Sequence, residues 1–135
     1  MKYDIHLARI YAPATKNDGA RILVDRLWPR GKRKEELHLT QWYRTASPPA
    51  SLRKDWHSGA IDEETFTRRY YELLMSDTDV LLPLIEYIRK GRVTLLTASQ
   101  DPRHSHLPVL QRALLDVLKS DDKPRQTDPG PDRKK

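Results

Sequence analysis

Two short segments of the chain combine residue types that could bind or transform an anion. The first, residues 25–32, reads Asp-Arg-Leu-Trp-Pro-Arg-Gly-Lys. Its guanidinium groups, on Arg26 and Arg30, suit phosphate or carboxylate, and Trp28 offers an aromatic face for a base or a cation. The alternative is structural: Trp28 fills the core, the proline and glycine form a turn, and Asp25 pairs with an arginine. The pattern alone leaves both interpretations open.

The second segment, residues 99–106, reads Ser-Gln-Asp-Pro-Arg-His-Ser-His. Ser105 could cap the helix that follows, and free N–H groups at a helix start attract anions. His104 and His106 are two residues apart, so they do not share a helix face and make a poor metal pair. Either histidine could act as a general acid or base, although packing also explains histidines in such a loop. We therefore predict no metal site.

An enzyme built on these segments would use His104 or His106 as acid or base, oriented by Asp25 or Asp101, with arginines holding the charge. The common catalytic motifs do not occur. The sequence has no Gly-x-Ser-x-Gly elbow, no phosphate-binding loop and no dinucleotide fingerprint, and its five glycines are scattered. We predict no cofactor, and the residues leave catalysis open.

Both segments follow apolar runs that read as strands. Residues 21–25 and 92–98 are short, continuous and rich in β-branched residues, and residues 3–11 alternate in part. A helix that stops at Gly91 precedes the last run, which is the helix-then-strand order of a βαβ unit. The predicted fold class is α/β: a small parallel or mixed sheet of about three to four strands, flanked by helices.

Apolar residues recur at helical spacing through most of the chain between the second and third predicted strands. Short helices are predicted around residues 39–43 and 52–56, and a third begins after Asp62. Asp79 is expected to cap a fourth helix, and residues 110–118 form the apolar side of the last one. The third helix is expected to present one apolar face, made of Phe66, Tyr70, Leu73 and Leu74.

Ligands of open α/β sheets bind beyond the carboxyl ends of the strands. Since both polar segments follow strands, we expect them to converge on one edge and to form a cleft. The side chains expected to face each other there are Arg21, Arg26 and Arg30 on one side, and Asp101, His104 and His106 on the other.

The composition indicates one domain, predicted over residues 1–119, followed by a disordered tail over residues 120–135. The 135 residues include 25 Lys and Arg against 19 Asp and Glu, a formal charge of +6. There is no cysteine, which excludes disulfides and thiolate chemistry and favours the cytoplasm. Neither a signal peptide nor a membrane-spanning run is expected.

Several blocks of the sequence resemble the YeaO-like branch of the family called domain of unknown function 488. The most specific is Val-Asp-Arg-Leu-Trp-Pro-Arg-Gly at residues 24–31, and Leu52-Arg53 also matches. The resemblance covers about Tyr3 to Leu118. It implies a small α/β fold but no particular catalytic activity. Members usually carry Asp-x-x-His-Asn-His-Ala after the last strand, and here Ser105 replaces the asparagine and leucine replaces the alanine.

The leading interpretation is an intracellular protein that binds a small anionic or phosphorylated ligand in an Arg- and His-lined cleft. The alternative is a nucleic-acid-binding module, in which residues 30–34 contact phosphates and Trp28 stacks on bases. A third interpretation uses an exposed helical face for dimerisation, made of Tyr70, Tyr71, Leu74 and Met75. No membrane partner is expected.

Overall fold

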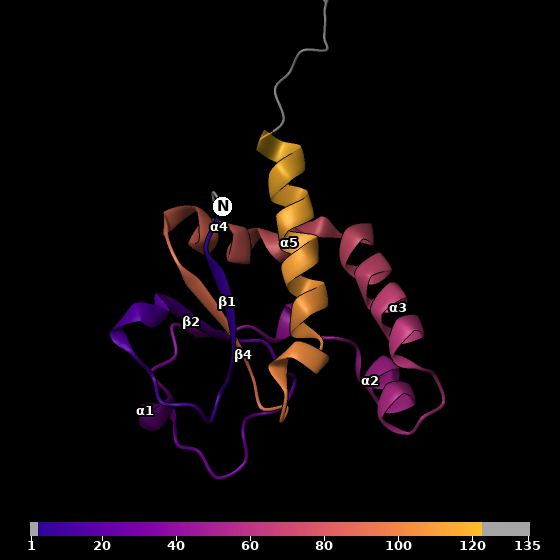
Figure 1. Ribbon diagram of the computed structural model, residues 1–135, viewed down its shortest axis with the longest axis horizontal. Coiled ribbons are helices and arrows are strands. Elements are labelled where there is room, and N and C mark those ends of the chain that lie inside the picture. The colour runs from indigo at the N-terminus through magenta and orange to yellow at the C-terminus, as the bar shows by residue number, and fades with distance from the viewer. Residues whose placement is uncertain (1–2, 123–135) are drawn as a thin grey trace, which may run out of the picture.

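The computed structural model describes residues 3–122, which form a parallel β-sheet flanked by helices (Figure 1). The sheet has four strands in the order β1-β4-β2-β3, and each neighbouring pair is parallel. The predicted α/β class is thereby confirmed. The strands are β1 (Ile5–Arg9), β2 (Ala20–Leu23), β3 (Gln41–Trp42) and β4 (Val93–Thr97).

Within residues 3–122, five α-helices and four short 3-10 turns connect and cover these strands. The α-helices are α1 (Lys34–Leu37), α2 (Ala50–His57), α3 (Glu63–Ser76), α4 (Leu82–Lys90) and α5 (Leu107–Asp122). The 3-10 turns are η1 (Lys16–Asp18), η2 (Arg44–Ala46), η3 (Thr78–Leu81) and η4 (Pro102–His104).

The sheet is buried on both faces because its central strands alternate between two apolar clusters. Ile22 and Leu95 point into the larger cluster, which is completed by residues of α2 to α5. Leu23 and Leu96 point into a smaller cluster that Leu37 of α1 closes from the other side. In Figure 1 the sheet accordingly lies between α1 and the larger helices.

The three predicted strands are confirmed, but the helix predicted around residues 39–43 is wrong. Residues 41–42 form β3, which pairs with β2 through Ile22 and Leu23. Backbone hydrogen bonds from Thr40 N–H to Arg21 O (2.8 Å) and from Tyr43 N–H to Leu23 O (2.8 Å) extend this pairing. The pairing partner lies about twenty residues away, so a local helical pattern does not reveal it.

The helix predicted after Asp62 is confirmed as α3, and the Asp62 carboxylate accepts a hydrogen bond from Thr65 N–H (2.8 Å). Its apolar face is narrower than predicted, since Leu73 is 47% exposed. Asp79 does not cap α4: it lies inside η3, and Leu81 occupies the cap position.

Of the face predicted for dimerisation on α3, Tyr71 and Met75 are half-buried, but the expected exposure of Tyr70 and Leu74 is wrong. Tyr70 and Leu74 are buried in the larger apolar cluster, where they pack under the sheet and the other helices. The Tyr70 hydroxyl also donates a hydrogen bond to Ala46 O (2.6 Å). This face of the helix stabilises the domain itself.

The last helix runs further than the predicted domain boundary. Residues 120–122, assigned to the tail by composition, form the final turn of α5. The remainder of the predicted tail, residues 123–135, lies outside the described residues. Within residues 3–122, no helix is both long and apolar enough to cross a bilayer.

Candidate functional site

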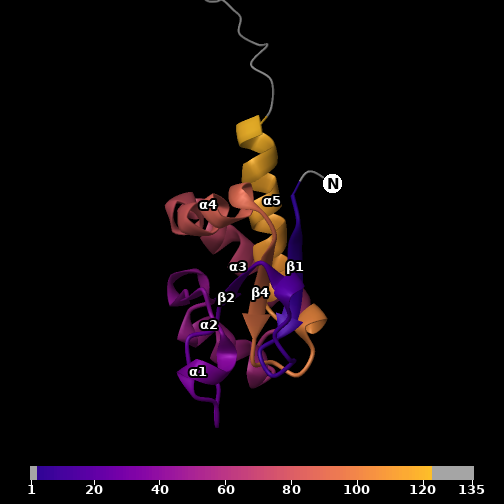
Figure 2. The same cartoon turned by 90° about the vertical axis from the view of Figure 1, so that its left-hand side faces the viewer.

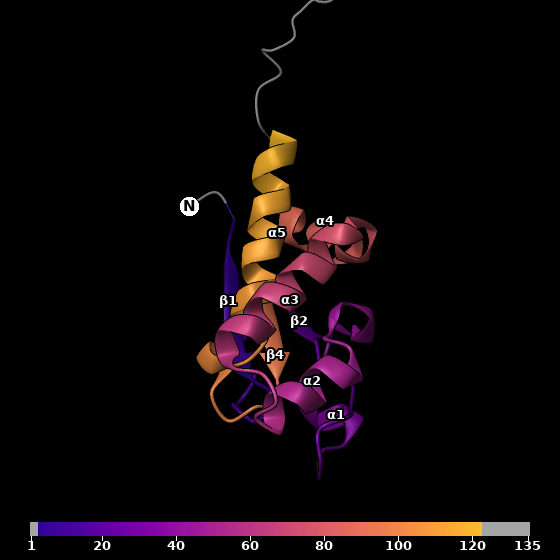
Figure 3. The same cartoon turned by 90° about the vertical axis from the view of Figure 1, so that its right-hand side faces the viewer.

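The carboxyl ends of β2 and β4 lie at one edge of the sheet, as neighbouring parallel strands require. Asp25 follows β2 closely, Ser99 follows β4, and His106 directly precedes α5. Figures 2 and 3 both show α1 and α2 at the end of the molecule where the arrowhead of β4 lies. Loop and helix residues are thereby brought to the predicted edge.

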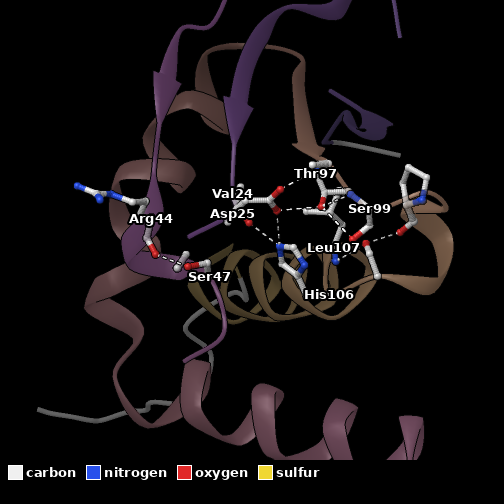
Figure 4. Close-up of polar contacts among 12 residues, drawn as sticks. Val24, Asp25, Arg44, Ser47, Thr97, Ser99, His106 and Leu107 are labelled. Atoms are coloured by element: carbon white, nitrogen blue, oxygen red, sulfur yellow. Dashed lines mark hydrogen bonds and ion pairs between the residues drawn. The ribbon is translucent and has the colours of Figure 1, made fainter. Parts of the chain in front are cut away.

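Asp25 is held rigidly at this edge by hydrogen bonds to both carboxylate oxygens (Figure 4). The Thr97 hydroxyl donates to Oδ1 (2.8 Å), and the Ala98 backbone N–H donates to Oδ2 (2.7 Å). The Trp42 indole N–H donates to the backbone oxygen of Asp25 (2.7 Å). The end of β2 is therefore tied to the end of β4 by a mostly buried carboxylate, each oxygen of which accepts a hydrogen bond.

His106 is 7% exposed and lies directly against Asp25. Its Nε2 is 2.5 Å from the Val24 carbonyl oxygen and 3.5 Å from Asp25 Oδ1 (Figure 4). Because a carbonyl can only accept, Nε2 carries the proton in this bond. Burial lowers the pKa of His106, aided by nearby Arg53 and His57 and opposed by Asp25 and the Val24 carbonyl. A neutral imidazole with an unprotonated Nδ1 results.

A cleft of about 400 Å³ opens beside these two residues. Its walls come from the loops after β1, β2 and β4, from the segment around α2, and from one residue of α3. They are Tyr11, Asp25, Leu27, Trp28, Pro29, Arg30, Pro48, Arg53, Trp56, His57, Phe66, Ala98, Ser99 and His106.

Positive charge predominates around this cleft. Arg30 and Arg53 line it, and within residues 3–122 neither guanidinium forms an ion pair. The cations of Arg9 and Lys32 lie over the Tyr11 ring, at 4.9 and 5.7 Å from its centre. Asp25 is the one carboxylate in the lining, and it is already hydrogen-bonded, so the walls are suited to an anion.

The remaining walls are aromatic. Trp56 stacks on Phe66 with the ring centres 4.0 Å apart. Trp28 is half-buried: its indole N–H donates to Lys32 O (2.6 Å), and its ring meets Trp42 edge-on at 5.2 Å. Trp28 therefore both packs against the smaller apolar cluster and forms part of the cleft wall.

The structure brings together four of the residues singled out from the sequence: Asp25, Trp28, Arg30 and His106. Arg21 is not among them. It is buried, and its guanidinium donates to Asp18 Oδ2 (2.6 Å) and to Leu37 O (3.1 Å). The expectation that Arg21 faces the cleft is incorrect, because these partners hold its side chain elsewhere.

The rest of the second segment also lies away from the cleft walls. His104 Nε2 is 3.9 Å from Asp101 Oδ2 at an exposed turn, and neither residue lines the cleft beside Asp25 and His106. Ser105 accepts a hydrogen bond from Leu107 N–H (3.1 Å), as a helix cap does. The side chain of Arg26 is exposed and is not part of the lining.

Sequence reasoning missed the contribution of α2, which supplies Arg53, Trp56 and His57 to the cleft. These residues are spaced at three and four positions, so they share one helix face, and this was an available signal. Tyr11 was missed as well, and Ser99, although inside the segment 99–106, was given no role. Their positions directly after two parallel strands could have pointed to them.

Residues 4–131 match the family described as the inactive DUF488-N3 subclade. The chain belongs to the DUF488 family. The resemblance found in residues 24–31 is thereby confirmed, and these residues supply Asp25, Trp28 and Arg30 to the cleft.

Two curated relatives match most of the domain. The chain is 37% identical over 107 residues to the "Uncharacterized protein YeaO" of Escherichia coli (strain K12), covering 79% of this chain and 93% of that protein. It is 34% identical over 110 residues to the "Uncharacterized protein Rv3073c" of Mycobacterium tuberculosis (strain ATCC 25618 / H37Rv), covering 82% and 92%. These similarities place the chain in the YeaO-like branch. No solved structure matches it.

Proposed function

We propose that this protein binds a small anionic ligand, with phosphate or carboxylate as the charged group, in the cleft beside Asp25 and His106. One observation carries the proposal: Arg30 and Arg53 line a half-enclosed cleft without forming an ion pair within residues 3–122. A guanidinium held at a concave, aromatic-walled site is a strong anion ligand. The cysteine-free composition supports a cytoplasmic location as part of the same proposal.

The proposed role is binding rather than turnover. The Asp25 oxygens accept from Thr97 and Ala98, and His106 Nε2 donates to a backbone carbonyl, so neither group has the geometry of an activated catalytic pair. Ser99 lies in the lining, but among the described residues no histidine forms a hydrogen bond with its hydroxyl. The description of the subclade as inactive agrees with this.

The cleft is larger than a bare phosphate, so the ligand is proposed to carry an organic part. Trp56, Phe66 and Leu27 offer an apolar wall against which a flat or aliphatic group would pack. The arginines would hold the charged end, and the aromatic rings would cover the rest.

Nucleic-acid binding is the alternative. Arg30, Arg33 and Lys34 are exposed in one run, which could contact phosphates. Two features argue against this role: Glu35 and Glu36 follow directly, and the Trp28 ring is partly packed against Trp42 rather than free to stack on a base.

The proposal is tested by titrating inorganic phosphate and pyrophosphate into the protein by calorimetry, with tryptophan fluorescence as a second signal. Two double variants have the same charge change: R30Q/R53Q in the cleft, and R26Q/R103Q on exposed positions outside its lining. Loss of two charge-assisted hydrogen bonds predicts at least roughly tenfold weaker binding by the cleft variant only.

Equal weakening in both double variants would show that bound anions merely respond to overall charge, and would contradict the proposal. Titration with single- and double-stranded oligonucleotides at two salt concentrations separates the alternative. Tight binding that falls steeply with salt, together with no response to pyrophosphate, would favour the nucleic-acid role.

A further inference from the structure

We propose that His106 makes the cleft selective for oxyanions that carry a proton, through a hydrogen bond that its Nδ1 accepts from the ligand. This inference rests on the proposed function and narrows the ligand class. It distinguishes hydrogen phosphate, or an anion with an adjacent hydroxyl, from fully deprotonated oxyanions such as sulfate.

The two ring nitrogens of His106 have different surroundings. Nε2 is committed to the Val24 carbonyl oxygen, at 2.5 Å, and this contact fixes the proton on Nε2. Nδ1 has no hydrogen-bond partner anywhere in residues 3–122, although His106 is only 7% exposed. A buried polar atom without a partner is uncommon in folded proteins, and it marks a place where a ligand or water completes the bonding.

His106 lines the same cleft as Arg30 and Arg53, so a bound anion would meet two donors and one acceptor. Burial lowers the pKa of His106, and nearby Arg53 lowers it further against the opposing effect of Asp25, so the imidazole is neutral at pH 7.5. The Tyr70 ring packs edge-on against the imidazole at 6.1 Å and limits its rotation. The acceptor is therefore presented in a fixed orientation.

A hydrogen-bond acceptor that faces a bound oxyanion favours ions that carry an O–H group over ions that carry none. Inorganic phosphate keeps at least one O–H group at neutral pH and can donate to Nδ1, while sulfate of the same shape has only lone pairs to offer. Sulfate would leave Nδ1 unpaired and would bring two acceptors together. The same arginines attract both ions, so charge alone does not separate them.

The test compares phosphate with sulfate at constant ionic strength and pH 7.5, by calorimetry on the full chain. H106Q keeps an N–H where Nε2 donates to Val24 O. Its amide oxygen branches from the carbon that replaces Cδ2, on the side away from Nδ1, so no acceptor stands at the Nδ1 position. H104Q, at a side chain 68% exposed and outside the cleft lining, is the matched control. We expect at least roughly tenfold tighter phosphate binding in the wild type and in H104Q, and preference below about twofold in H106Q.

The outcomes separate the two proposals. Equal affinity of the wild type for both ions overturns the selectivity while the anion site stands, and binding of neither ion overturns both. A preference for phosphate in H106Q as large as that of the wild type overturns the role of Nδ1. Should H106Q fail to fold, ¹⁵N NMR of the wild type decides: phosphate, and not sulfate, must shift the unprotonated Nδ1 resonance, and absence of this shift contradicts the inference.

Discussion

His106 and Asp25 form a pair in which one group is charged, the other is neutral, and both are anchored to backbone. The Asp25 carboxylate holds the ends of β2 and β4 together through Thr97 and Ala98. The imidazole adds a bond to Val24, at the end of β2. These contacts serve the fold and the site at once, because the same bonds that join the strands fix the cleft floor.

Asp25→Asn is predicted to destabilise the fold. The remaining amide oxygen would have to accept from the Ala98 N–H, so the NH₂ group would face the Thr97 hydroxyl. The bond that this hydroxyl donates would be lost, and its oxygen already accepts from Ser99 N–H. Loss of such a partly buried bond costs about 1–3 kcal/mol of unfolding free energy. Urea unfolding measures this, with the exposed Glu86→Gln as control. A change no larger than that of the control would contradict the anchoring role.

The neutral state of His106 predicts a pH dependence of stability. Burial lowers its folded-state pKa below the value of about 6.5 expected in the unfolded chain. In the window below about 6.5 the unfolded state therefore binds more protons, so the unfolding free energy falls as the pH decreases, until the folded-state pKa is reached. Urea unfolding from pH 7.5 to 5.0 should show this fall, and H106Q should show less of it. An equal fall in both proteins would contradict the assignment.

At the scale of elements, the sequence predicted those whose signal is local. The apolar runs at residues 21–25 and 92–98 became β2 and β4, and Asp62 caps α3 as its position indicated. The short strand β3 was mistaken for a helix because its pairing with β2 is a tertiary contact. For the same reason Arg53 was missed, since only the packing of α2 brings it beside His106.

The residue just before β2 is Gly19, and a larger side chain at this position would collide with the backbone of Arg92. Gly19 has a φ of +68°, and a Cβ built there would lie 2.2 Å from Arg92 O, which accepts a hydrogen bond from Ala20 N–H (3.0 Å). Gly59 also has a positive φ, +84°, but a Cβ would meet nothing within 4 Å. Both positions therefore have a strained backbone for any residue other than glycine, but an added Cβ would clash with a neighbouring atom only at position 19.

Gly19→Ala is predicted to cost clearly more stability than Gly59→Ala. A positive φ costs both alanine variants about 1–2 kcal/mol, and only the first must also displace the backbone of Arg92, just before β4. Thermal or urea unfolding of both variants measures the difference. Equal destabilisation would show that the close approach of Gly19 to Arg92 is not maintained in solution.

At the scale of the whole molecule, the residues that line the cleft lie where the parallel strands end. The cleft is lined by residues from the loops after β1, β2 and β4 and by residues of α2. Figure 3 shows α2 beside the arrowhead of β4. The α/β class and the edge at which the cleft lies followed from the sequence, because strands and the loops after them are continuous segments of the chain. Which side chains reach the cleft did not follow, as Arg21, His104 and Asp101 demonstrate.

The central claim is that an oxyanion binds between Arg30 and Arg53, next to His106. Crystals of the protein soaked in arsenate, which keeps a proton as phosphate does and scatters anomalously, test it most directly. We predict an anomalous peak inside the cleft, within hydrogen-bond distance of both guanidinium groups and of His106 Nδ1. Peaks confined to surface arginines and lysines, with an empty cleft at saturating arsenate, would contradict it.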